Sequence, residues 1–189
     1  TSMISKDFVN RGFEKVTYKE YADFYVLNTC SVTDNADKEA RKLIRQAKRS
    51  NPNAKIAVIG CYAQLNPEEI SNIKGVDLVV GSENKFNLLN ELDRLNLNGG
   101  SKVVRSNIKE TSSFIPSYSI GDRTRSYLKI QDGCDYVCSF CTIPLARGKS
   151  RSDSIKKTID LANQAINEGA KELVLTGVNI GDFGKQTNE

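Results

Sequence analysis

The sequence predicts an α/β protein whose first part is an open parallel sheet of the Rossmann or flavodoxin-like kind. Short apolar runs alternate with segments of helical periodicity over residues 24–95, and the same alternation resumes after residue 124. The 189 residues are 39% hydrophobic, as in an ordinary globular protein, and no apolar run approaches the roughly 18 residues of a membrane span. We therefore expect a domain at 1–105, a linker at 106–123 and the start of a second domain at 124–189.

The first domain contains three predicted strands, each followed by a predicted helix. The strands are Phe24–Leu27, Lys55–Gly60 and Asp77–Gly81. The helices are Ala36–Arg49, a short helix from Asn66 to Gly75, and Asn87–Leu95. Thr33 and Asp34 are suited to cap the first helix, and Pro67 to stand at the first position of the second. Because the amphipathic segment Met3–Arg11 lacks the strand that a parallel sheet would place before it, we expect a fragment of a longer protein.

The second domain reads as a single βαβ unit. Its parts are a strand at Ser126–Ile130, a cysteine-containing loop, a helix at Asp153–Glu168 stopped by Gly169, and a strand at Glu172–Leu175. A turn cluster at 96–101 and a stretch rich in serine and threonine at 106–123 separate it from the first domain. One βαβ unit has too little apolar surface to form a domain alone, so the second domain is expected to be incomplete.

Three of the five cysteines lie on one short loop. Cys134, Cys138 and Cys141 have the spacing C-x3-C-x2-C. Three thiolates on so short a loop suit one face of an iron–sulfur cube, which needs four ligands, and one iron would remain open. Structural zinc usually takes a second, more distant ligand pair, often with histidine, and the chain has no histidine. A disulfide or a chance cluster of core or surface cysteines is the other interpretation.

The other two cysteines occupy matching places in the first domain. Cys30 ends the first predicted strand, and Cys61 ends the second. Because the carboxyl ends of parallel strands line the ligand crevice of an open sheet, the two thiols could meet at one ligand. Each alone is more often a buried core cysteine.

Further candidate residues lie near the cysteine loop. Phe140 could stack on a flat ring, or it could pack against the sheet. Arg147, Lys149 and Arg151 lie on one predicted loop, which suits a phosphate or a carboxylate, although a solvated basic loop fits equally. The segment 176–181 follows a strand's carboxyl end, where backbone groups next to glycine commonly meet a ligand.

Composition excludes some functions and permits others. Without histidine, the usual Ser-His and Cys-His nucleophile pairs are excluded. The 27 lysines and arginines exceed the 23 acidic residues by only four charges, which permits a nucleic-acid partner without requiring one. The odd number of cysteines and the lack of a secretory signal at residues 1–7 predict a reducing, cytoplasmic location and no membrane.

The cysteine loop, with an aromatic residue before its last cysteine, resembles the signature loop of radical S-adenosylmethionine enzymes. Wider strings resemble the methylthiotransferases within that superfamily: Asn28–Thr33, Gly60–Gln64, Tyr127–Cys134, Ala146–Ser152 and Glu172–Gly181. The resemblance covers nearly the whole chain and implies that the second domain is the first βαβ unit of an incomplete radical-SAM βα barrel. The strings are most similar to the branch that methylthiolates N6-threonylcarbamoyladenosine beside the anticodon of tRNA.

The resemblance also implies cofactors and partners. A first [4Fe–4S] cluster on the three-cysteine loop would bind and reduce S-adenosylmethionine, giving a radical that abstracts hydrogen from C2 of the adenine. A second [4Fe–4S] cluster, on Cys30, Cys61 and a third cysteine absent from this chain, would hold the sulfur that is transferred. The residues implied at S-adenosylmethionine are Phe140, Thr176, Gly177 and Asn179. The partners would be tRNA and a reductant such as flavodoxin or ferredoxin.

Two alternatives remain at this point. The substrate could be that of a sister branch, which is isopentenyladenosine in tRNA or a ribosomal protein. The chain could instead be a non-catalytic iron–sulfur electron-transfer module in which Cys30 or Cys61 supplies the fourth ligand to the loop. Since one cysteine of the second cluster and the rest of the barrel are missing, we expect this fragment by itself to be inactive, with Cys30 and Cys61 as free thiols.

Overall fold

The computed structural model describes residues 2–30, 34–95, 100–119 and 125–187, without the side chains of 34–37. Two compact units make up the chain: the first unit is essentially Met3–Ile108, and the second unit is essentially Lys109–Glu189. The predicted cap at Thr33, residues 96–99 of the turn cluster and residues 120–123 of the predicted linker lie outside the described residues. Among the helices that are described, none has both the length and the apolar content needed to cross a membrane.

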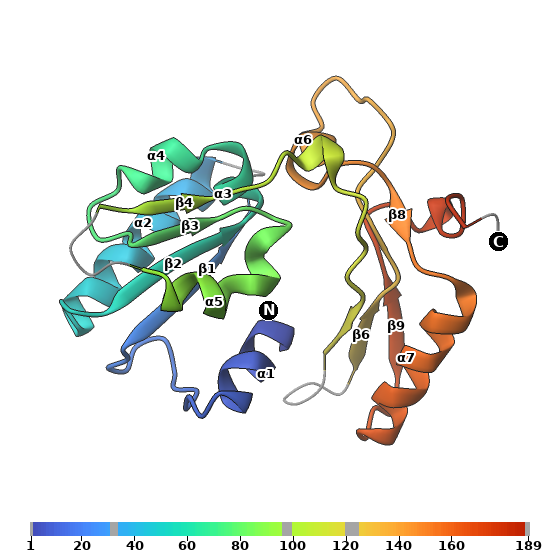
Figure 1. Ribbon diagram of the computed structural model, residues 1–189, viewed down its shortest axis with the longest axis horizontal. Coiled ribbons are helices and arrows are strands. Elements are labelled where there is room, and N and C mark those ends of the chain that lie inside the picture. Colours follow the sequence, from blue (N-terminus) through green and yellow to red (C-terminus); the bar gives the residue numbers. More distant parts are fainter. Residues whose placement is uncertain (1, 31–33, 96–99, 120–124, 188–189) are drawn as a thin grey trace. The chain divides into compact units, whose positions relative to one another are not determined.

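The first unit contains one parallel sheet with helices on both faces (Figure 1). Its strands are β1 (Phe24–Thr29), β2 (Lys55–Gly60), β3 (Leu78–Val80) and β4 (Lys102–Val104). Its helices are α1 (Ser2–Asn10), α2 (Asp34–Ser50), α3 (Cys61–Leu65), α4 (Pro67–Ser71), the 3-10 helix η1 (Asn84–Asn87) and α5 (Leu88–Asp93). The strands lie in the order β1-β2-β3-β4, and every neighbouring pair is parallel. The predicted open parallel α/β sheet is confirmed.

Alternation of side chains along β2 builds a core on each face of this sheet. Ile56 and Val58 face a cluster to which α2, α3 and α4 contribute, while Ala57 and Ile59 face a cluster with α1 and α5. The helical members of the first cluster are Ile44, Ala47, Tyr62, Ala63 and Ile70. Those of the second are Ile4, Leu88 and Leu92, with Phe8 packed against them. Burial on both faces explains why β2 is an uninterrupted apolar run.

Local boundaries in the first unit differ from the predictions at several points. Cys61 is the first residue of α3 and does not end the preceding strand. Asn66 stands at the N-cap of α4, but its side chain makes no capping hydrogen bond. The helix predicted over 87–95 begins as a 3-10 turn and is an α-helix only over Leu88–Asp93. The strand β4 was not predicted, because a three-residue edge strand is too short to show alternation.

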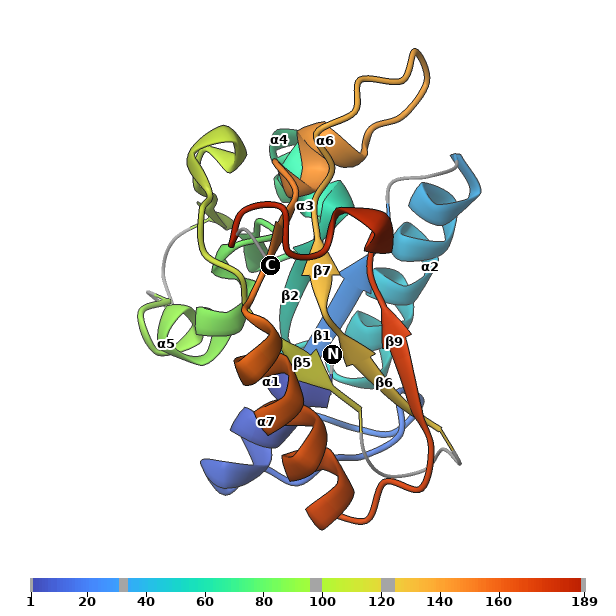
Figure 2. The same cartoon turned by 90° about the vertical axis from the view of Figure 1, so that its right-hand side faces the viewer.

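The second unit is built on a parallel strand pair. Its strands are β5 (Ser117–Tyr118), β6 (Ser126–Lys129), β7 (Gln131–Asp132), β8 (Arg151–Ser152) and β9 (Leu173–Thr176). Its helices are the 3-10 helix η2 (Ile108–Glu110), α6 (Ile143–Arg147), α7 (Ile155–Asn167) and the 3-10 helix η3 (Ile180–Asp182). β6 and β9 pair in parallel, with Ser126 opposite Leu173, and α7 lies between them in the chain (Figure 2). The predicted βαβ unit is therefore present.

Two features of the second unit were not predicted. β5, which lies within residues 106–123, pairs antiparallel with β6. β7 and β8 form a two-residue antiparallel ladder that joins the two ends of the segment carrying the three-cysteine loop. The helix α7 begins at Ile155 and not at the predicted Asp153, because the Ser154 hydroxyl accepts a hydrogen bond from the Lys157 backbone N–H and so caps the helix.

Candidate iron–sulfur and cofactor site

The three-cysteine loop leaves β7 and runs out to α6 (Figure 2). Two backbone hydrogen bonds shape it. The N–H of Cys134 donates to the carbonyl of Gly148 over 3.0 Å, and the N–H of Cys141 donates to the carbonyl of Cys138 over 3.1 Å. The first bond holds the start of the loop against the residue that follows α6. The second closes a turn between the last two cysteines.

Gly133 fixes the base of this loop. Its φ is +72°, a left-handed conformation that side chains other than that of glycine rarely adopt. A Cβ atom at this position would lie 1.9 Å from the backbone oxygen of Lys149 and 2.7 Å from that of Gly148. Glycine is therefore required here both for the backbone angle and for the close approach of the two segments.

The donor set of the loop suits an iron–sulfur cluster. Cys134, Cys138 and Cys141 are all free thiols; Cys138 is exposed and the other two are half-buried. Within the described part of the chain, however, no three His, Cys, Asp or Glu side chains are gathered closely enough to hold a metal ion. The three thiols share one loop, but they would have to converge when a cluster binds.

Apolar side chains on the same loop point into solvent. Val137 is 96% exposed and Phe140 is 92% exposed. Phe140 therefore does not pack against the sheet, which was the structural alternative for this residue. Its ring is available for stacking on a planar group.

Cys30 and Cys61 follow neighbouring strands at the same edge of the first unit's sheet. Thr29 and Gly60 are register partners, and the two cysteines come directly after them. The close approach of these two strand ends requires glycine at position 60, because its φ is +105° and a Cβ atom there would lie 2.5 Å from the backbone oxygen of Thr29. Cys30 is exposed and Cys61 is half-buried, and both are free thiols.

The turn after β9 is held mainly through its backbone. The Thr176 hydroxyl donates to the carbonyl of Leu128 over 3.2 Å, so this side chain joins the two parallel strands. The backbone N–H of Asn179 donates to the side-chain oxygen of Gln131 over 2.8 Å. At Gly177 a Cβ atom would lie 2.9 Å from the same oxygen. The turn and the residue that begins β7 are thus in direct contact.

The basic run after α6 binds a carboxylate of the protein itself. Arg151 is buried, and Asp132 is its register partner in the β7–β8 ladder. The Arg151 guanidinium also donates to the carbonyls of Arg147 and Lys149, at 2.6 and 2.9 Å, and to that of Ser113 at 2.9 Å. Of the two interpretations of this loop, that of a solvated basic loop does not hold for Arg151, which is a buried structural cation.

Asp132 lies at the centre of a charge cluster beneath the cysteine loop. Its carboxylate pairs with three cations: Lys129 at 3.1 Å, Arg147 at 3.1 Å and Arg151 at 3.8 Å. Burial raises the pKa of the Asp132 carboxyl, but the three cations outweigh burial and lower the pKa to about 2. Burial also lowers the pKa of the Lys129 ammonium group, against the opposing effect of Asp132. The cluster ties the strand before the loop to the strand after it.

Replacing Asp132 with asparagine is expected to destabilise the second unit by about 2 kcal/mol, because the buried carboxylate that pairs with Lys129, Arg147 and the buried Arg151 is lost. Urea unfolding of the chain measures this loss. The matched control is Asp160→Asn on α7, whose partner Lys156 lies in an exposed pair at 2.9 Å and should cost under about 0.5 kcal/mol. Equal losses of unfolding free energy in the two variants would show that the Asp132 cluster stabilises the second unit no more than an exposed ion pair does.

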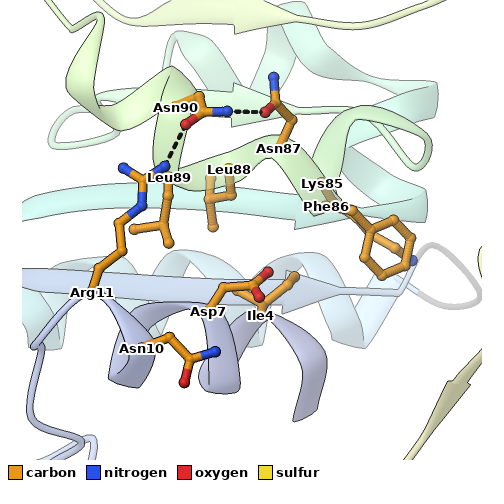
Figure 3. A pocket seen from close by; sticks show the side chains of 10 residues that line it. All are labelled: Ile4, Asp7, Asn10, Arg11, Lys85, Phe86, Asn87, Leu88, Leu89 and Asn90. Atoms are coloured by element: carbon orange, nitrogen blue, oxygen red, sulfur yellow. Dashed lines mark hydrogen bonds between the residues drawn. The ribbon is translucent and has the colours of Figure 1, made fainter.

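A pocket in the first unit contains none of the predicted site residues. It has a volume of about 240 Å³ and opens between α1 and the segment formed by η1 and α5 (Figure 3). Arg11 donates to the side-chain oxygen of Asn90, and Asn90 donates to that of Asn87. Three of the polar side chains that line the pocket, those of Arg11, Asn90 and Asn87, are thus joined by hydrogen bonds.

Comparison with known proteins gives the family. Residues 1–81 match the family described as "Uncharacterized protein family UPF0004". The chain is 41% identical to "Threonylcarbamoyladenosine tRNA methylthiotransferase MtaB" of Bacillus subtilis strain 168, over 100% of this chain and 42% of that relative. The protein of the same name from Aquifex aeolicus is also 41% identical, over 97% of this chain and 45% of that relative. Residues 1–81 thus match that family model, and the chain as a whole is similar to these methylthiotransferases.

Methylthiotransferase relatives under a second name are also similar. "tRNA-2-methylthio-N(6)-dimethylallyladenosine synthase" of Bifidobacterium adolescentis is 34% identical over 92% of this chain and 38% of that relative. The chain spans less than half the length of these curated relatives. The resemblance to methylthiotransferases that the sequence strings indicated is confirmed at the level of the family.

Proposed function

We propose that this chain is the cofactor-binding part of a tRNA methylthiotransferase that acts on C2 of N6-threonylcarbamoyladenosine beside the anticodon. The observation that carries the proposal is the 41% identity, over the whole of this chain, to a relative with that name. The relatives named for the dimethylallyladenosine reaction are less similar, at 31–34% identity. The proposed setting is the cytoplasm, where tRNA and a reductant such as flavodoxin or ferredoxin are present.

Cys134, Cys138 and Cys141 would hold a [4Fe–4S] cluster through three irons and leave the fourth open for S-adenosylmethionine. When bound, that cluster would supply the electron that cleaves S-adenosylmethionine. Cys30 and Cys61 would hold a second cluster together with a further cysteine. Their places after register partners at one sheet edge support this assignment.

The remaining candidate residues would orient S-adenosylmethionine. Phe140, whose ring is exposed, would stack against the adenine. Gly177 and Asn179 would present backbone groups at the end of β9, where ligands of parallel sheets bind. Thr176 would act by holding the start of this turn, since its hydroxyl already bonds to the neighbouring strand β6.

The test uses the full-length protein with both clusters reconstituted under anaerobic conditions. Under reduction it should convert S-adenosylmethionine to 5′-deoxyadenosine and add a methylthio mass to N6-threonylcarbamoyladenosine in tRNA, read by nucleoside mass spectrometry. Addition of that mass to isopentenyladenosine or to a ribosomal protein instead would assign the chain to a sister branch. Absence of S-adenosylmethionine cleavage by a protein with full iron content would overturn the proposed function.

A further inference from the structure

One buried side chain connects the cysteine loop to the turn after β9. Gln131, the first residue of β7, is 1% exposed. Its amide nitrogen donates to the carbonyl of Gly133 over 2.8 Å, to that of Asp132 over 3.0 Å and to the Ser150 hydroxyl over 3.0 Å. Its amide oxygen accepts from two backbone N–H groups, those of Val178 and Asn179, each over 2.8 Å.

These contacts satisfy the whole amide. A glutamine side chain has two N–H donors and one oxygen with two lone pairs, and at Gln131 both ends are engaged. The nitrogen faces the residue directly before Cys134, and the oxygen faces a turn 47 residues further along the chain. The planar amide therefore sets the spacing between the first cysteine of the loop and the Gly177–Asn179 turn.

Packing on the amide is close. A Cβ atom on Gly177 would lie 2.9 Å from the Gln131 side-chain oxygen and 3.0 Å from its Cβ. The turn therefore rests directly on this side chain, and a shift of the side chain must move the turn. Leaving one end of this buried amide without a partner would destabilise the folded chain by about 1–3 kcal/mol. The contacts of the nitrogen and those of the oxygen are therefore maintained together.

A second buried glutamine lies close in sequence to a cysteine of the first unit. Gln64 is 7% exposed and lies three residues after Cys61. Its amide nitrogen donates to the carbonyl of Ser106 over 3.2 Å, and its oxygen accepts from the N–H of Ser82, which follows β3, over 3.0 Å. Replacing Gln64 therefore removes the same kind of buried amide, but near the other candidate cluster.

We propose that Gln131 is a positioning residue that aligns the cysteine loop with the S-adenosylmethionine-binding turn. The inference rests on the proposed function. Residues that orient metal ligands through hydrogen bonds typically change metal affinity or activity by about 10- to 100-fold when replaced. We expect an effect of that size on S-adenosylmethionine cleavage.

The test compares Gln131→Met with Gln131→Glu in the reconstituted full-length protein. Methionine keeps the length but removes both ends of the amide, so kcat/KM for S-adenosylmethionine cleavage should fall about 10- to 100-fold, with a raised KM. Glutamate keeps an oxygen acceptor for the Val178 and Asn179 N–H groups but places an oxygen against the Gly133 carbonyl. The KM of Gln131→Glu should therefore be closer to the wild-type value than that of Gln131→Met, while its kcat remains low.

Spectroscopy and two controls separate positioning from general damage. The change that S-adenosylmethionine causes in the electron paramagnetic resonance spectrum of the reduced loop cluster should be lost in Gln131→Met. It should persist in Gln64→Met, which perturbs the other candidate cluster. Gln164→Met, an exposed position on α7, should have wild-type kcat and KM.

A Gln131→Met protein with full iron content and wild-type KM, kcat and spectrum would overturn the inference while leaving the proposed function intact. If Gln131→Met does not fold, wild-type kcat and spectrum in Gln131→Glu would overturn it equally. A wild-type protein that does not cleave S-adenosylmethionine would overturn the proposed function and this inference with it.

Discussion

Replacing Gly133 with alanine is expected to destabilise the second unit by about 3 kcal/mol or more and to prevent stable binding of a cluster by the loop. The alanine methyl would stand 1.9 Å from the backbone oxygen of Lys149, and the backbone would have to keep φ at +72°. Since the colliding atom belongs to the backbone, no side-chain rotation can relieve the contact. The hydrogen bond from Cys134 to Gly148 would be lost as the segments separate.

Gly169→Ala is the matched control for this prediction. Gly169 has φ +102°, yet in the described part of the chain no atom beyond its two chain neighbours lies within 4 Å of the position of its Cβ. It therefore carries the backbone penalty without the collision and should cost about 1–2 kcal/mol. Urea unfolding and iron content per chain measure both variants. If the two lose equal stability and bind equal iron, the close approach at Lys149 does not govern the loop.

Replacing Cys134 with serine is expected to lower S-adenosylmethionine cleavage by about 100-fold or more, because loss of a direct ligand should exceed the effect of changing a residue behind it. Serine keeps the size of the side chain and removes the thiolate. The rate of 5′-deoxyadenosine formation in the reconstituted full-length protein measures the loss. Cys138→Ser and Cys141→Ser should behave alike, since the three thiols share one loop.

The double variant Cys30→Ser, Cys61→Ser tests the second candidate cluster in the same way. It should retain S-adenosylmethionine cleavage and the spectrum of the loop cluster but fail to transfer the methylthio group, because these cysteines follow strands of a separate sheet. A changed spectrum of the loop cluster in this variant would contradict two separate clusters. It would support the electron-transfer module, in which Cys30 or Cys61 is the fourth ligand.

Much of the first unit's fold could be predicted from local pattern. β2 is an apolar run buried on both faces, and α2 carries a helical period over Asp34–Ser50 between β1 and β2. These patterns extend over enough residues to be distinguished from chance runs of apolar residues. The strands β7 and β8, of two residues each, are below that length, and only the pairing of Gln131 with Ser152 and of Asp132 with Arg151 defines them.

Sequence pattern alone was enough to select the candidates for the chemistry: five cysteines, their spacing, and the strand ends after which Cys30 and Cys61 stand. The functional roles of these residues stay predictions. That Arg151 turns inward to Asp132, and that Gln131 joins the loop to a turn 47 residues away, could be seen only in the folded chain. Such contacts depend on how β6 and β9 pair and on the approach of Gly133 to Lys149, and no local periodicity encodes either.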